Sequence, residues 1–133
     1  MIPGRAFRWV LLVALLGCGE RERLTFPDEN PGNGAGPITE ITRPGSDTVM
    51  TEGDLLFVQG RTYDVDGVDT VYFETGGANQ GFAPIEAEGD DTVSFLLQIS
   101  TLNLGGRTVI VRVHGVDLLG EQGDFSIRQI RIE

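Results

Sequence analysis

The sequence TVSFLLQIS at residues 92–100 decides the fold, because apolar and polar side chains alternate along it with the period of a β-strand. Residues 108–114, TVIVRVH, carry the same alternation one strand later. A strand patterned in this way buries one face and exposes the other. We therefore expect two strands whose apolar faces meet across one core, formed by Val93, Phe95, Leu97, Ile99, Val109, Val111 and Val113.

Short β-branched and aromatic runs, separated by Gly and Asp clusters, continue on both sides of these two strands. Short strands at near-regular spacing are typical of an antiparallel β-sandwich or barrel. We predict seven strands, at residues 38–42, 54–63, 68–75, 82–87, 92–100, 108–117 and 125–132, with residues 48–51 continuing the first strand on the other sheet. In the last strand the phase of the apolar residues changes after Ile127, which predicts a β-bulge near Arg128 or Gln129.

Three segments resemble bacterial immunoglobulin-like domains: LLFVQGRTYD at residues 55–64, DGVDTV at 66–71 and GRTVIVRVHGVD at 106–117. The resemblance implies an all-β, immunoglobulin-like sandwich over residues 38–133. The Cys, Trp and Cys of antibody-type domains are missing, which fits the bacterial and fibronectin-like branches of this fold. The resemblance specifies the fold much better than it specifies a function.

The N-terminus has the features of an export signal. Basic residues Arg5 and Arg8 are followed by an apolar run that is too short for a permanent membrane helix. Leu15-Leu16-Gly17-Cys18 resembles the lipobox of bacterial lipoproteins, which implies that residues 1–17 are removed and that Cys18 carries a covalent lipid. The alternative is an ordinary signal peptide that leaves an unpaired cysteine.

In the family's sorting rule an Asp after the lipidated cysteine retains the protein on the inner membrane. Gly19 stands at that position and favours the outer membrane of the bacterial cell envelope. Residues 18–37, which are rich in Pro and Gly, are expected to form a flexible, disordered linker between the anchor and the domain.

The charge of the chain restricts its partners. Removal of residues 1–17 takes away two of the ten basic residues and none of the twenty acidic ones, so the net charge changes from −10 to −12. Nucleic acid is therefore excluded as an expected partner. With its single cysteine lipidated, the chain has no disulfide, and its stability must come from one hydrophobic core.

Acidic residues gather at two predicted turns. The turn after residues 54–63 and the turn after residues 108–117 share one pole of such a sandwich. Carboxylates in this arrangement suit a hard cation such as Ca²⁺, although the spacing does not match an EF-hand loop. The alternative is that these residues shape their turns by bonding to their own backbone. The five candidate ligands are Asp64, Asp66, Asp69, Asp117 and Glu121.

No catalytic constellation is evident. His114, the only histidine, is expected on the outward face of its strand, and no nucleophile elbow accompanies it. The glycine-rich residues 76–81 lack the Lys and the helix of a phosphate site and are expected to form a mobile loop. The aromatic residues that could form a glycan platform, although most should belong to the core, are Tyr63, Tyr72, Phe73 and Phe82.

These features predict a non-catalytic, lipid-anchored protein of the cell envelope whose immunoglobulin-like domain binds a protein or a carbohydrate. One alternative is a structural spacer or assembly module without a specific ligand. A second alternative is an accessory domain of a carbohydrate-active system. No cofactor is expected apart from the lipid on Cys18 and the candidate Ca²⁺.

Overall fold

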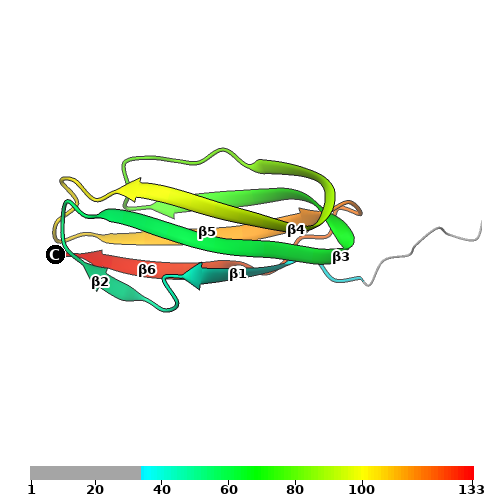
Figure 1. The fold of residues 1–133 in the computed structure, drawn as a ribbon, viewed down its shortest axis with the longest axis horizontal. Coiled ribbons are helices and arrows are strands. Elements are labelled where there is room, and N and C mark those ends of the chain that lie inside the picture. The colour runs from blue at the N-terminus through cyan, green and yellow to red at the C-terminus, as the bar shows by residue number, and fades with distance from the viewer. Residues whose placement is uncertain (1–33) are drawn as a thin grey trace, which may run out of the picture. The chain divides into compact units, whose positions relative to one another are not determined.

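The computed structural model describes residues 34–133, which contain six β-strands and no helix (Figure 1). The strands are β1 (Ile38–Arg43), β2 (Thr48–Met50), β3 (Leu55–Gly76), β4 (Ile85–Ser100), β5 (Thr108–Asp117) and β6 (Ser126–Ile132). No helix in this part of the chain is long and apolar enough to cross a membrane.

The strands form the two layers of an immunoglobulin-like sandwich. In one layer, β1 and the second half of β4 pair with the first half of β3. In the other layer, the second half of β3 lies between the first half of β4 and β5, and β6 and β2 follow. Strands β3 and β4 thus belong to both layers, and both bend at the end of the domain on the right of Figure 1.

The number of strands differs from the prediction for a local reason. The predicted strands 54–63 and 68–75 are one continuous strand, and 82–87 and 92–100 are another. Gly67 (φ 85°) and Gly89 (φ 94°) take up the bends without ending the strands, since glycine adopts positive φ without strain. One pair departs from the antiparallel pattern, because β2 runs parallel to β6.

The core is the one that the alternation predicts. On β4 the side chains of Val93, Phe95, Leu97 and Ile99 are at most 8% exposed, and on β5 those of Val109, Val111 and Val113 are fully buried. The partner face adds Leu56, Val58, Val71, Leu104, Ile130 and Ile132. Phe73 packs edge-on against Phe95, with 5.3 Å between the ring centroids. The core therefore links both layers through side chains from nearly every strand.

The predicted bulge in the last strand is wrong. Residues of β6 pair with β5 without any register shift. Ile130 and Ile132 face the core, whereas Ile127 stays on the outer face and is 43% exposed. Arg128 has the same core-facing phase, and its guanidinium donates to the carbonyl oxygens of Ile41, on β1, and of Pro44, in the connection between β1 and β2. A charged residue on the inner phase therefore explains the change of pattern that suggested a bulge.

The segment before β1 is packed against the domain. Pro37 is buried, and a side chain at Gly123 would collide with its backbone. A Cβ at Gly115 would lie 2.5 Å from Cγ2 of Thr62 and 3.0 Å from Cβ of Pro37. These two glycines let the chain enter the sandwich at the end where β3 and β4 bend.

Candidate functional site

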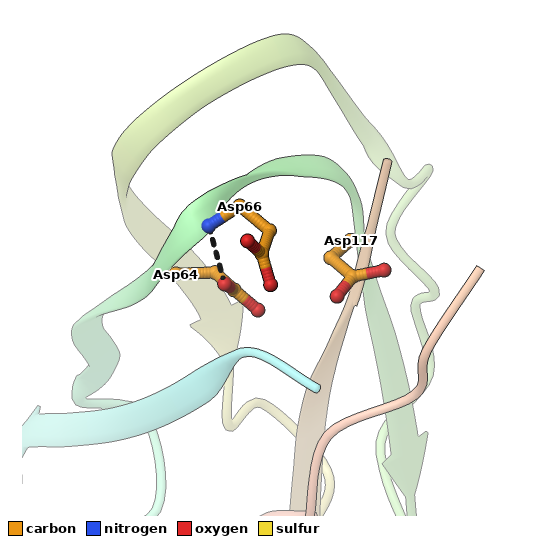
Figure 2. Close-up of side chains that lie close together, drawn as sticks. All are labelled: Asp64, Asp66 and Asp117. Carbon is orange, nitrogen blue, oxygen red and sulfur yellow. Dashed lines mark hydrogen bonds between the residues drawn. The ribbon is translucent and has the colours of Figure 1, made fainter. Parts of the chain in front are cut away.

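Three carboxylates meet at the bend of β3. Asp64 and Asp66 lie in the bend itself, and Asp117 is the last residue of β5. One carboxylate oxygen from each residue lies within 4.8 Å of the other two. Figure 2 shows the three side chains turned toward one another across the gap between the two strands. We refer to Asp64, Asp66 and Asp117 as the acidic cluster.

One oxygen of each buried aspartate shapes a turn. Asp64 Oδ1 accepts a hydrogen bond from the backbone N–H of Asp66 at 2.8 Å. Asp117 Oδ1 accepts two, from Leu119 N at 2.9 Å and from Glu121 N at 2.8 Å. Aspartate favours tight turns for this reason. The Oδ1 atoms therefore have a structural role that the sequence suggested.

The second oxygens of these two residues have no such partner. Asp64 is 6% exposed and Asp117 is 1% exposed. Their Oδ2 atoms are buried and lack a hydrogen bond within the described part of the chain. None of the ion pairs among residues 34–133 involves Asp64 or Asp117. Two buried carboxylate oxygens thus lie close together without a hydrogen-bond donor from residues 34–133.

The other two predicted ligands lie outside the acidic cluster. Asp69 is exposed, and its Oδ2 accepts a hydrogen bond from the hydroxyl of Thr70 at 3.1 Å. Glu121 is exposed, and only its backbone meets Asp117: its N–H donates to Asp117 Oδ1, and its carbonyl oxygen accepts a hydrogen bond from Asp117 N. The structure therefore brings together three of the five predicted carboxylates.

A second cluster lies on the outer face of the layer that contains β5. The rings of Tyr72 and His114 stack with 5.2 Å between centroids, and His114 meets Phe125 at 4.4 Å. The guanidinium of Arg112 lies 4.2 Å from the centre of the Phe125 ring and pairs with Glu74 at 3.2 Å. We refer to Tyr72, His114, Phe125 and Arg112 as the aromatic row.

Only part of the aromatic row was predicted from the sequence. Tyr72, which is 40% exposed, was among the predicted residues of a glycan platform, whereas Phe125 was predicted only as the first residue of the last strand. The sequence feature that could have predicted the aromatic row is that Phe125, His114 and Arg112 all have the outward phase of their strands. The pairing of β5 with β6 ends at Val113 and Ser126, and Phe125, which precedes Ser126, contacts His114 and Arg112 there.

His114 lies on the outward face, as expected, but it is half-buried between its two aromatic neighbours. Burial holds its pKa below the ordinary value of 6.5, and Arg112 lowers the pKa further while Glu74 raises it. Desolvation penalises the charged imidazolium, so the neutral ring is favoured. His114 accordingly contributes a flat aromatic surface.

The remaining aromatic candidates do not form one platform. Tyr63 hydrogen-bonds Glu40 at 3.3 Å, and Arg61 lies over its ring. Phe73 and Phe82 pack against the core. The loop expected to be mobile is fastened to β4 by Gln80, whose side chain bonds the backbone of residues 98 and 100. Cys18, the signal peptide and all but the last residues of the linker lie outside the described residues.

The sequence matches no protein-family model and no curated protein. Solved structures show distant likenesses. Fibronectin(III)-like modules of Clostridium thermocellum CbhA match with 15% identity and a TM-score of 0.49 over 74% of this chain, which spans about half (47%) of theirs. A PKD domain of a peptidase from a Thermoplasmatales archaeon matches with 17% identity and a TM-score of 0.48, over 72% of this chain and 91% of that domain. The SrpA adhesin of Streptococcus sanguinis matches with 11% identity and a TM-score of 0.48, over 79% of this chain and 60% of the adhesin.

Proposed function

We propose that this chain is a non-catalytic lipoprotein of the bacterial cell envelope, whose immunoglobulin-like domain binds a protein or a carbohydrate through the aromatic row. A lipid on Cys18 anchors the chain, and residues 19–37 separate the domain from the membrane. Two or three acyl chains on such a cysteine hold a protein on a membrane almost permanently. Gly19 directs the protein to the outer membrane.

The aromatic row is the observation that carries the binding role. Tyr72, at 40% exposure, presents a large apolar surface whose orientation is already fixed by stacking on His114. Ring faces pack against sugar rings or apolar side chains, and Tyr and Arg are enriched where proteins bind one another. Little side-chain entropy remains to be lost when a ligand packs on a ring that is already held in place.

Ligand binding is tested with two matched aromatic variants. The full chain in detergent is applied to a glycan array and to peptidoglycan fragments, and it is crosslinked to envelope proteins in cells. We expect Tyr72→Ala to reduce binding at least tenfold. Phe57→Ala is the control, because Phe57 lies on β3 in the other layer and is also covered by an arginine, Arg43 at 5.9 Å. Equal losses in the two variants, or no ligand at all, would instead favour the spacer role.

The anchor is tested separately. In a Gram-negative host, labelling with a palmitate analogue should mark the wild-type chain and should be lost in Cys18→Ser, which should leave the membrane fraction. Gly19→Asp keeps the cysteine and should move the labelled protein to the inner membrane. Labelling that persists in Cys18→Ser would refute the lipid anchor. If the labelled Gly19→Asp protein stays in the outer membrane, the sorting role of residue 19 is refuted, but the lipid anchor is not.

A further inference from the structure

We propose that the acidic cluster binds one Ca²⁺ ion, which fastens the bend of β3 to the end of β5. The site is formed by Asp64, Asp66 and Asp117, each contributing a carboxylate oxygen. It depends neither on the lipid anchor nor on the aromatic row, which lies on the outer face of the sheet. It adds a ligand of a different kind from the one proposed above.

The buried Oδ2 atoms of Asp64 and Asp117 carry the argument. Each belongs to a side chain that is more than nine-tenths buried, and each lacks a hydrogen-bond partner among the described residues. A buried carboxylate oxygen without a donor or a cation is strongly unfavourable. The carboxylates that carry these atoms are turned toward Asp66 (Figure 2). A cation at this point would satisfy both oxygens at once.

The positive groups of the described chain are engaged elsewhere. Arg61 pairs with Glu40, Arg112 with Glu74 and Arg131 with Glu133. Arg128 donates to the connection between β1 and β2, and Arg43 lies over Phe57. Arg107 precedes β5, at the end of that strand opposite Asp117. None of these side chains is therefore paired with the buried carboxylates of Asp64 and Asp117.

Turn geometry explains only half of each buried carboxylate. The hydrogen bonds that shape the turns all end on Oδ1 of Asp64 or of Asp117. An asparagine would accept the same bonds without adding a buried charge. The presence of two buried acids beside a third, Asp66, therefore calls for an explanation besides the turns, and cation binding provides one.

The ligand atoms and their spacing favour Ca²⁺. Carboxylate oxygen is the ligand of hard cations, and none of the three residues offers nitrogen or sulfur from its side chain. Opposed oxygens around Ca²⁺ are roughly 4.6–5.2 Å apart, against about 4.1 Å around Mg²⁺. The oxygens of the acidic cluster lie within 4.8 Å of one another, which is inside the span of a Ca²⁺ coordination sphere.

Binding would couple two segments. Asp64 and Asp66 belong to the bend between the two layers, and Asp117 begins the turn that ends near Glu121. One hydrogen bond, from Leu118 N to Gly67 O at 3.2 Å, already connects the turn to the bend. An ion held by both segments adds a stronger link at this place.

The test is a thermal melt of the full chain in detergent, with Ca²⁺, with Mg²⁺ or with EGTA at constant ionic strength. At 100 times its dissociation constant, Ca²⁺ should raise Tm by about 10 °C or more. Titration calorimetry should give one ion per chain. We expect Mg²⁺ to produce a much smaller shift.

Three variants locate the site. Asp64→Asn and Asp117→Asn keep the turn acceptor and should abolish the response, and without Ca²⁺ they should melt at or above the parent because a buried charge is removed. Asp66→Asn, at a half-buried position, serves if either variant fails to fold. Asp69→Asn is the control, because it removes a nearby acid outside the acidic cluster and should leave the Ca²⁺ shift intact.

The proposal is overturned by either of two results. Melts that coincide in Ca²⁺ and EGTA, with no heat of binding, would show that the buried oxygens are satisfied without the ion. A shift that survives in both Asp64→Asn and Asp117→Asn, or in Asp66→Asn where one of those two fails to fold, would place Ca²⁺ elsewhere. Neither result would affect ligand binding by Tyr72 or labelling of Cys18, so the proposed function is tested independently.

Discussion

Replacing Arg128 with Met should cost this domain much more stability than the same replacement at Arg131, although both arginines lie on β6. Arg128 faces inward and donates from Nε to Pro44 O and from Nη2 to Ile41 O, both at 2.8 Å. A longer bond of 3.3 Å reaches Gly45 O. Arg131 points outward, and its ion pair within residues 34–133 is with Glu133, at 3.8 Å.

The magnitude follows from these contacts. Hydrogen bonds to a charged donor contribute about 1.5–3 kcal/mol each, and partial exposure of Arg128 reduces the two short ones to about 1 kcal/mol each. Arg128→Met should thus lower the free energy of unfolding by about 2 kcal/mol and Tm by roughly 8–16 °C. Arg131→Met should change stability by less than about 0.5 kcal/mol, because an exposed ion pair contributes little.

Urea unfolding of the full chain, followed by circular dichroism, measures the difference directly. The midpoint should fall in Arg128→Met while the m-value stays constant, since the fold is retained. Arg128→Lys should recover only part of the loss, because an ammonium group cannot reproduce the planar fork. The reasoning is refuted if Arg128→Met and Arg131→Met unfold within about 0.5 kcal/mol of each other.

Three further predictions concern single side chains. Burial lowers the pKa of His114 in the folded domain, so the unfolded chain binds a proton at His114 more readily. The stability of the domain should therefore fall as the pH drops below 6.5. Thermal melts between pH 5 and 7.5 should show a smaller fall for His114→Gln. The hydroxyl of Thr101 is fully buried; it accepts a hydrogen bond from Gly53 N and donates one to Asp54 O. Thr101→Val should therefore lower the free energy of unfolding in urea by about 1–3 kcal/mol. Thr101→Ser keeps the hydroxyl and should lower it less. Gly115→Ala should destabilise the domain by about 1–3 kcal/mol, because the added methyl group would collide with Thr62 and Pro37. Gly106→Ala is the control in the same assay: a Cβ there meets nothing within 4 Å, but φ is 81°, so this variant measures backbone strain without a collision.

The site was predictable to the extent that it depends on turn residues. Asp64, Asp66 and Asp117 stand out because Asp and Gly interrupt the strands, and the order of strands in a sandwich brings their turns to one pole. Asp69 and Glu121 occur in the same turns but point elsewhere. Asp64 and Asp69, for example, are five residues apart in the bent strand β3. The pattern of residue types along the chain does not show which way each side chain points after the bend.

The aromatic row was only partly predictable for a related reason. Alternation placed His114 and Arg112 on the outward face of their strand, and this placement is correct. Their contacts with Phe125 depend on the register between β5 and β6. Register is a relation between two segments, so neither segment carries it alone.

The sequence by itself determined the all-β class, the buried faces of β4 and β5, and the position of the acidic turns, because hydrophobic periodicity and turn chemistry are local properties. Tertiary structure alone decided that β3 and β4 continue from one layer into the other and that Arg128 faces inward to hold the β1–β2 connection. It also decided that two carboxylate oxygens are buried without a hydrogen-bond partner in the part of the chain that the structure describes. Burial and pairing depend on segments far apart in the chain, and only the packed sandwich brings those segments together.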